Sequence, residues 1–225
     1  MRDCKAIFSN SFIASLILLA SFLWTIAPAQ DAEPIAGEAL VRALQGGGYN
    51  VYFRHAATDW SQDDQVRVAG DWTSCDPSRI RQLSDEGRRT AREVGKAIRA
   101  LGIPIGRVIA SPYCRTVETA RLMGLGPVET TTDVMNLRVA EFFGGRKAIT
   151  CRARMRLAVK PAPGTNTVVV AHGNVAREAT DVYPGEGEGI VFRPGGNGNF
   201  IFIGRLTPEQ WARLAEELSR TIRRP

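Results

Sequence analysis

Two stretches of the sequence share one construction: Val51-Tyr52-Phe53-Arg54-His55 and Val168-Val169-Val170-Ala171-His172-Gly173. Each is a short apolar run that ends on a histidine, and the chain contains no other histidine. Such runs are typical of strands buried in a parallel sheet. Ligands of open α/β sheets bind at the carboxyl ends of the strands. We therefore expect His55 and His172 to face one site.

The segments around these strands alternate between helical and extended patterns. Ser84 is a predicted helix N-cap, and apolar residues follow it at helical spacing as far as Leu101. Thr207 and Gln210 form a predicted capping box for a C-terminal helix. Further helices are predicted from Ser111 to about 123, near 147–159 and from about 174, and further strands at 107–110, 190–192 and 200–204. This order predicts an α/β fold, a three-layer α/β/α sandwich with a mainly parallel central sheet.

The N-terminal segment has the pattern of a secretory signal peptide. It has a basic start, residues 12–27 are mostly apolar, and Ala27-Pro28-Ala29 fits the small-x-small cleavage rule. The apolar run is shorter than the roughly 20 residues that a membrane span needs. We therefore predict a cleaved signal peptide at 1–29, a single domain at 30–225, and a periplasmic or secreted protein without a stable membrane anchor. An uncleaved anchor is the alternative.

Composition narrows the class of partner. The chain of 225 residues carries a net charge of +6. Its positive residues are spread over predicted helix faces and form no basic tail with interleaved aromatics, which argues against nucleic acid. A modest positive field favours small anions instead. Two histidines without clustered carboxylates do not make a metal centre, so we expect neither a metal nor another cofactor. The sequence leaves the oligomeric state open.

Three cysteines remain after the predicted leader: Cys75, Cys114 and Cys151. In an oxidising compartment one pair among them can form a disulfide. Cys75 lies in the long polar loop before the helix at Ser84, and Cys114 lies directly before Arg115. These two loops are expected to meet beside the site. The pair Cys75–Cys114 is therefore favoured, while the other pairings stay open.

The residue types at the strand ends suit phosphoryl chemistry. Such a site needs cationic donors around the phosphate oxygens, an in-line nucleophile and a proton for the leaving oxygen. Arg54 and Arg115 supply planar guanidinium groups, which suit bidentate phosphate contacts. A neutral imidazole is nucleophilic when one ring nitrogen is held as a donor and the other is free. A backbone carbonyl in the turn after His55 would provide that restraint. Singly, these residues would be read as surface arginines and structural histidines.

Four motifs in one fixed order resemble those of the histidine phosphatase superfamily, the group that includes the cofactor-dependent phosphoglycerate mutases. They are Arg54-His55-Ala56-Ala57-Thr58-Asp59-Trp60, Leu83-Ser84 with Gly87, Ala91 and Gly95, Ser111-Pro112-Tyr113-Cys114-Arg115-Thr116-Val117-Glu118-Thr119-Ala120, and Ala171-His172-Gly173. The resemblance covers most of the predicted domain. It implies that His55 is the phosphorylated nucleophile and that Arg54, Arg115 and His172 form the phosphate pocket.

The chain departs from the family pattern at three positions. The usual glycine after the first histidine is Ala56, and the acidic residue often found next is Ala57. The usual asparagine shortly after the motif is Ser61, which can still donate a hydrogen bond. Ser61 therefore joins Arg54 and Arg115 among the predicted phosphate-binding residues.

The function expected from these features is an exported, metal-independent phosphomonoesterase that hydrolyses a small phosphorylated substrate through a phosphohistidine on His55. A phosphomutase is one alternative, although the usual substrates of mutases are cytosolic and the predicted leader argues against it. The other alternative is a non-catalytic phosphate- or glycan-binding protein of the same fold, which Ala56 and Ala57 keep open. The substrate itself is not predicted.

A proton donor for the leaving group is the least defined part of the predicted site. Glu141 is favoured because Asn136-Leu137-Arg138-Val139-Ala140-Glu141 loosely resembles the segment where one branch of the family carries its acid. Asp59, on the loop that leaves the nucleophile, is the second candidate. Arg79 and Arg81 either line the pocket or lie on a solvated loop face.

Overall fold

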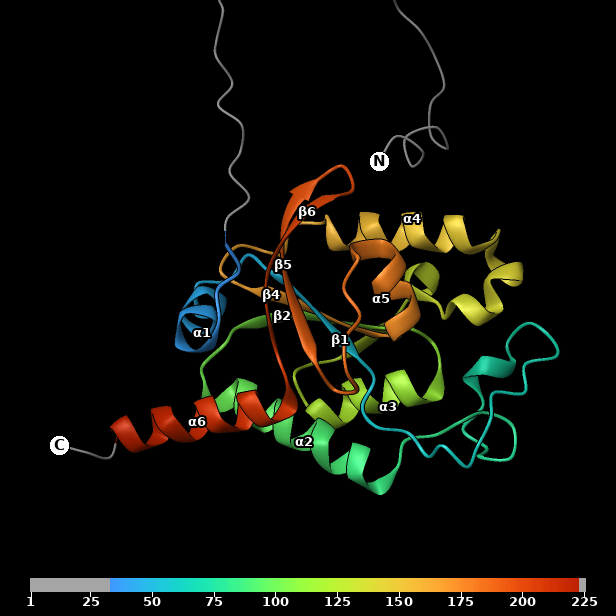
Figure 1. Cartoon of the computed structure of the whole chain (residues 1–225), viewed down its shortest axis with the longest axis horizontal. Helices are drawn as coiled ribbons and strands as arrows, with labels where there is room; N and C mark the ends of the chain where they lie inside the picture. The colour runs from blue at the N-terminus through green and yellow to red at the C-terminus, as the bar shows by residue number, and fades with distance from the viewer. Residues whose placement is uncertain (1–32, 223–225) are drawn as a thin grey trace, which may run out of the picture. The chain divides into compact units, whose positions relative to one another are not determined.

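The computed structural model describes residues 33–222, and its strands form one six-stranded sheet (Figure 1). The strands are β1 (Asn50–Arg54), β2 (Ile105–Ala110), β3 (Val128–Thr130), β4 (Asn166–Ala171), β5 (Gly189–Gly196) and β6 (Asn199–Leu206). Their spatial order is β3-β2-β4-β1-β5-β6. Neighbours among the first four strands of this order pair in parallel. The β1–β5 and β5–β6 pairs are antiparallel. The mainly parallel sheet is therefore confirmed.

Helices connect the strands and cover both faces of the sheet. The α-helices are α1 (Gly37–Gln45), α2 (Asp85–Ala100), α3 (Cys114–Met123), α4 (Arg146–Leu157), α5 (Gly173–Thr180) and α6 (Pro208–Ile222). Short 3-10 turns are η2 (Asp71–Thr73), η3 (Thr132–Val134) and η4 (Leu137–Phe143). All of these elements belong to one packed unit.

Alternation along the buried strands builds two apolar cores. Successive side chains of a strand point to opposite faces of the sheet. Val51 and Phe53 of β1 belong to the core shared with α1, α2, α3 and α6, while Tyr52 belongs to the core shared with α4 and α5. Figure 1 shows α2 and α6 on one side of the sheet and α4 and α5 on the other. The predicted three-layer α/β/α sandwich is confirmed.

The start of α2 is held close to the turn that follows β1. The Ser84 hydroxyl accepts a hydrogen bond from the Gly87 amide at 3.0 Å, so Ser84 is the predicted N-cap. A Cβ atom on Gly87 would lie 2.0 Å from the Ala57 carbonyl oxygen. Only glycine therefore allows the helix to approach the backbone just beyond His55.

Two differences separate the observed elements from the predicted ones. Helix α1 was not predicted; it buries Leu40, Val41 and Leu44 but begins without a side-chain cap. Its N-terminus thus lacks the capping residue that marks α2. The segment between β3 and α4 holds the two 3-10 turns η3 and η4, whose short runs leave no clear helical period.

The predicted signal peptide at 1–29 lies outside the described residues. Within residues 33–222, no helix has the length and apolar character needed to cross a membrane.

A disulfide joins the loop before α2 to the first residue of α3. Cys75 and Cys114 are bonded, with their Cα atoms 5.4 Å apart, which confirms the favoured pair. The bond spans 39 residues of sequence and fixes the long loop against the residue before Arg115. The loop is otherwise poor in regular structure, with only η2 and an isolated bridge between Thr58 and Leu83.

Candidate active site

Two adjacent parallel strands bring both histidines to the same edge of the sheet. Arg54, the last residue of β1, is in register with Ala171, the last residue of β4. The His55 amide donates to the Ala171 carbonyl at 2.9 Å. The two imidazole rings consequently lie 5.7 Å apart between centroids. The prediction that His55 and His172 face one site is met by this geometry.

The turn after β1 fixes the tautomer of His55. Its Nδ1 atom lies 2.9 Å from the Ala56 carbonyl oxygen. A carbonyl only accepts hydrogen bonds, so Nδ1 carries the proton of the neutral ring and Nε2 keeps its lone pair. Nε2 has no hydrogen-bond partner among the described residues. This is the backbone restraint that the sequence analysis required for a nucleophilic imidazole.

Burial and neighbouring charges keep both histidines neutral. Burial, followed by the Arg115 charge, lowers the pKa of His55 to about 3. Burial and the same arginine also hold the pKa of His172 well below its ordinary value. Both rings are therefore uncharged at neutral pH in the unliganded protein.

The side chains around His172 fix its tautomer as well. The Asn136 Oδ1 atom accepts hydrogen bonds from the Arg138 amide at 3.0 Å and from Asn174 Nδ2 at 2.7 Å. This leaves Asn136 Nδ2 to donate to His172 Nδ1 at 3.3 Å. The proton of the neutral His172 ring is thus on Nε2, which lies 2.9 Å from the Ser111 hydroxyl.

Two buried tyrosines fix the backbone and the ring of His172. The Tyr52 hydroxyl donates to the His172 carbonyl at 2.7 Å and accepts from the His172 amide at 3.0 Å. The Tyr113 ring packs edge-on against the imidazole, with the centroids 4.7 Å apart. His172 is therefore held by the sheet, by the turn between β2 and α3, and by Asn136 at the start of η4.

Arg115, at the second position of α3, forms a buried end-on pair with Asp64. Nη1 and Nη2 of Arg115 donate to the two Asp64 oxygens at 2.8 and 2.9 Å, and Nη1 also donates to the Arg81 carbonyl at 3.2 Å. The two side chains are only 4% and 6% exposed. Although burial opposes it, hydrogen bonds from Arg115 and from the Arg81 amide hold the pKa of Asp64 below its ordinary value.

The end-on pair leaves one edge of the Arg115 guanidinium without a hydrogen-bond partner in residues 33–222, here called the open edge. That edge consists of Nε and the second N–H of Nη2. Nε is buried and has no hydrogen-bond partner among the described residues. Because an unsatisfied buried donor is costly, this edge is suited to two oxygens of a bound anion.

Arg54, the residue before His55, is anchored by the loop before β5. It donates to Glu186 at 3.1 Å and to the Pro184 carbonyl at 3.4 Å. Its guanidinium also lies 5.5 Å from the centre of the Tyr183 ring. Thr58 donates to the same Glu186 oxygen at 3.4 Å.

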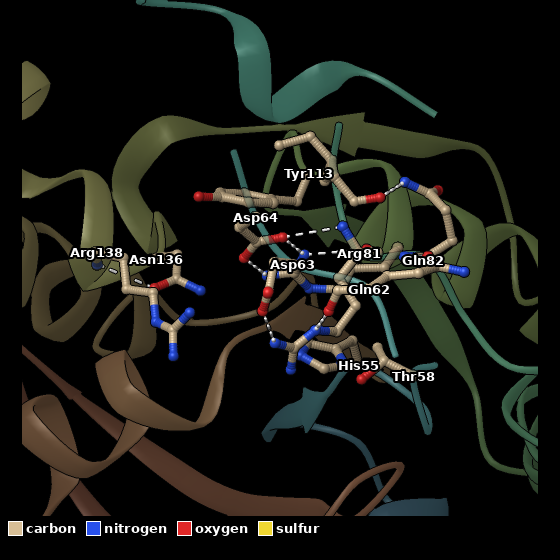
Figure 2. A network of polar contacts seen from close by, with 12 residues as sticks. His55, Thr58, Gln62, Asp63, Asp64, Arg81, Gln82, Tyr113, Asn136 and Arg138 are labelled. Atoms are coloured by element: carbon tan, nitrogen blue, oxygen red, sulfur yellow. Dashed lines mark hydrogen bonds and ion pairs between the residues drawn. The ribbon is translucent and has the colours of Figure 1, made fainter. Parts of the chain in front are cut away.

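These side chains enclose a cavity of about 380 Å³. Figure 2 shows Asp63, Asp64 and Arg81 gathered beside His55, with Asn136 and Arg138 to their left. The cavity is lined by Arg54, His55, Thr58, Trp60, Asp64, Arg81, Arg115, Asn136, Arg138, Arg146, His172, Gly173, Asn174, Tyr183 and Glu186. Arginine is the most frequent residue in this wall, so the cavity is suited to an anion.

A larger hollow of about 860 Å³ lies beside the disulfide and is lined by Cys75 and Cys114. It contains neither histidine, so its size does not make it the site of phosphoryl chemistry. Within residues 33–222, no group of three or more histidine, cysteine, aspartate or glutamate side chains is arranged to hold a metal ion.

Two of the predicted site residues are not brought to the cavity. Ser61 is exposed, and its hydroxyl donates to Asp59 at 2.7 Å instead of facing His55. Glu141 is exposed on η4, whereas the buried residues of that turn are Leu137, Val139 and Ala140. The turn directs its apolar side to the core, and Glu141 does not line the cavity.

The other predicted residues divide clearly. Arg54, His55, Arg115 and His172 all line the cavity, and so does Arg81. Asp59 does not line it, and Arg79 instead pairs with Asp71 on the surface of the loop. Glu118, from the same motif as Arg115, pairs with Arg88 of α2 and so links α3 to α2.

Sequence reasoning missed several groups that contact these residues, among them Asp64, Ser111, Asn136 and Glu186. Asp64 and Glu186 lie in loops without periodicity, so no pattern relates them to the arginines that they bind. Ser111 could have been found from the sequence, because it directly follows β2 and so lies at the same edge of the sheet as the histidines.

Comparison with known proteins finds a matching family model and several similar solved structures. The family model of the histidine phosphatase superfamily (branch 1) matches residues 51–156. A search of curated proteins found no significant relative. One similar solved structure is the protein histidine phosphatase SixA with tungstate, at 16% identity and a TM-score of 0.49, covering 71% of this chain and 97% of that chain. Another is a phosphoserine phosphatase mutant from Entamoeba histolytica with phosphoserine, at 13% identity and a TM-score of 0.48, covering 72% of this chain and 98% of that chain. A mycobacterial glucosyl-3-phosphoglycerate phosphatase with VO3 is similar over 69% of this chain and 97% of its own, with 15% identity and a TM-score of 0.49.

The matched residues contain His55 and Arg115, while His172 lies beyond them on the neighbouring strand end. The family match over residues 51–156 and the order of the four motifs both point to the histidine phosphatase superfamily.

Proposed function

We propose that the protein is an exported phosphomonoesterase that transfers the phosphoryl group to His55 and then to water, without a metal ion. The observation that supports it most directly is the pairing of a free His55 Nε2 with the open, buried edge of Arg115 in one cavity. A nucleophile and an anion-binding edge side by side are what phosphoryl transfer requires.

In the first step, the lone pair of His55 Nε2 attacks phosphorus and the bond from phosphorus to the ester oxygen breaks. The Nδ1 proton stays on the ring and continues to donate to the Ala56 carbonyl, so that carbonyl stabilises the positive charge that develops on the imidazole. Arg54 and the open edge of Arg115 bind the phosphoryl oxygens. Their fixed charges take the role that a metal ion has in many other phosphatases.

The leaving alcohol needs a proton, and in this proposal Glu186 enters the first step as the carboxylic acid, donates its proton to the leaving oxygen and becomes the carboxylate. Asp64 is engaged on both oxygens by Arg115 and is held as the anion. Glu186 uses one oxygen for Arg54 and Thr58, and its side chain is 21% exposed toward solvent. In the second step water attacks phosphorus, the bond from Nε2 to phosphorus breaks, and the Glu186 carboxylate accepts the water proton.

Export belongs to the same proposal. Disulfides persist in oxidising compartments, and the bond between Cys75 and Cys114 supports such a location. The mature N-terminus is expected at Gln30 and is read by N-terminal sequencing of protein from the native host. A mature chain that still begins at Met1 would contradict cleavage.

The enzymatic part is tested with mature protein in excess chelator. We expect hydrolysis of p-nitrophenyl phosphate and a phosphoryl group on His55 that is labile in acid and stable in base. His55→Ala should lower kcat/KM by more than about 10⁴-fold, as expected for a covalent nucleophile. Full activity of that variant, or complete loss of wild-type activity on chelation, would refute the mechanism.

The proton donor is tested by comparing two leaving groups. An alkoxide needs protonation, whereas a nitrophenolate hardly does. Glu186→Gln should therefore slow alkyl phosphate hydrolysis about 100-fold and p-nitrophenyl phosphate hydrolysis by much less.

Binding of inorganic phosphate without any turnover in the wild type would favour the non-catalytic alternative instead.

A further inference from the structure

Three large aromatic side chains are exposed within residues 33–222, and the two most exposed, Trp60 and Tyr183, line the cavity of His55, whereas Phe142 does not. Trp60 is 66% exposed on the loop after β1, and Tyr183 is 50% exposed on the loop after α5. Leaving a ring of this size in water is unfavourable compared with burying it. Two such rings on one small polar cavity point to a ligand that covers them.

The Trp60 ring is held as a flat support. The Arg81 guanidinium lies 4.2 Å from its centroid and covers one face. Arg81 is itself fixed, since its Nε donates to the Gln62 carbonyl at 2.8 Å and its Nη2 lies 3.4 Å from Asp63. Its side chain is only 12% exposed. The indole thus has one supported face, and most of its remaining surface is open.

The Tyr183 ring is brought close to the second histidine. A Cβ atom on Gly173 would lie 3.0 Å from two atoms of that ring, so the glycine after His172 permits the approach. The ring also lies over Arg54 at 5.5 Å. Each aromatic ring therefore contacts an arginine of the cavity wall: Trp60 contacts Arg81, and Tyr183 contacts Arg54.

We infer that the alcohol part of the substrate is a sugar ring, so that the natural substrate is a monosaccharide phosphate; this rests on the proposed function. The apolar C–H face of a sugar ring packs on an indole. Its hydroxyl oxygens accept hydrogen bonds, and Arg138 and Asn174 provide donors in the same wall. The Arg138 guanidinium forms no hydrogen bond or ion pair within the part of the chain that the structure describes.

The size of the cavity favours a single ring. At about 380 Å³ it lies near the lower end of the usual range for ligand pockets, about 300–1,000 Å³. A sugar phosphate places its ring next to the phosphate group. A nucleoside monophosphate places its base one ribose farther away and needs more room. The donor-rich wall also suits hydroxyl groups better than a plain aryl ring.

The test compares kcat/KM for glucose 6-phosphate with kcat/KM for glycerol 3-phosphate, which has hydroxyl groups but no ring. Trp60→Ala should lower the value for the sugar phosphate about tenfold and leave that for glycerol 3-phosphate within about twofold. Trp60→Phe should restore most of the difference. Val68→Ala is the matched control, because Val68 is an exposed apolar residue of the same loop that does not line the cavity.

Equal losses on both substrates would overturn the inference, and so would a larger loss on adenosine monophosphate or p-nitrophenyl phosphate than on the sugar phosphate. These outcomes are distinct from failure of the proposed function. In that case the wild-type protein would hydrolyse none of the four esters and form no phosphohistidine.

Discussion

The two walls of the cavity are built in different ways. One wall consists of the ends of β1 and β4, where hydrogen bonds of the sheet place His55 and His172. The other is the loop between β1 and α2, which has little regular structure and is tied down at separate points by the Asp64–Arg115 pair and the Cys75–Cys114 bond. The sheet wall positions the imidazoles, while the loop wall orients Arg115 and shapes the space for the substrate.

This difference predicts where each kind of damage will be seen. Changes in the sheet wall should remove chemistry while the substrate preference stays the same. Changes in the loop wall should alter stability, the orientation of Arg115 and the choice of substrate, while the nucleophile remains intact.

After loss of the nucleophile itself, the largest effect is expected at Arg115, the residue that joins the two walls. Arg115→Ala should lower kcat/KM by about 10²–10³-fold, the usual cost of one preorganised donor. Arg115→Lys should recover little, because a lysine cannot present two parallel N–H groups to phosphate while it also pairs with Asp64. Steady-state kinetics on p-nitrophenyl phosphate measures both variants. Near wild-type activity of Arg115→Lys would show that the open guanidinium edge is not the phosphate contact.

The disulfide should contribute mainly to stability. Replacing Cys75 and Cys114 with serine together should lower the free energy of unfolding by about 2–4 kcal/mol, because the unfolded chain gains the freedom of the released loop. Denaturant unfolding of the oxidised wild type and of the double variant gives the difference, with reduced wild type as the control. Phosphohistidine should still form on the double variant. Identical unfolding midpoints would show that the loop is held without the bond.

The neutral histidines should make stability depend on pH. His55 has a pKa of about 3 in the fold and an ordinary value of about 6.5 when unfolded, so the unfolded chain binds more protons below pH 6.5. Stability that is present above pH 6.5 is then lost as the pH falls toward 3, at up to about 1.4 kcal/mol per pH unit for this group. Urea unfolding between pH 6.5 and 5 measures the slope. His55→Gln should give a shallower slope, and equal slopes would contradict the burial argument.

What could be predicted from the sequence follows the same division. The strands ending at His55 and His172 were readable because burial in a parallel sheet leaves a continuous apolar run. The position of Arg115 followed from a motif on α3. Asp64 and Glu186 were not found, because a carboxylate in an irregular loop has no period that relates it to its arginine. The position of Glu141 outside the cavity could not be foreseen for a similar reason: η4 is a kinked 3-10 turn, and its direction cannot be read from spacing.

A smaller loss is expected when the partner of Arg115 is changed. Asp64→Asn removes one acceptor, so Arg115 is freer to rotate, and kcat should fall about tenfold. KM should not rise, because the variant also removes a negative charge beside the bound phosphate. Asp63→Asn is the matched control, because the Asp63 side chain next in the chain is 85% exposed. This substitution should change kcat and KM by less than about twofold. A raised KM with unchanged kcat would show that Asp64 does not orient Arg115 for the chemical step.

The smallest effect is expected at Glu141. Its carboxylate is exposed on η4 and does not line the cavity, so it has no route to the leaving oxygen. Glu141→Gln should change kcat/KM for both alkyl and nitrophenyl phosphates by less than about twofold, since isolated surface substitutions cost little. Glu186→Gln, measured on the same two esters, should separate them. A selective loss on alkyl phosphates in the Glu141 variant would require η4 to turn toward the cavity when substrate binds, and the proton donor would then belong to that turn instead of the loop before β5.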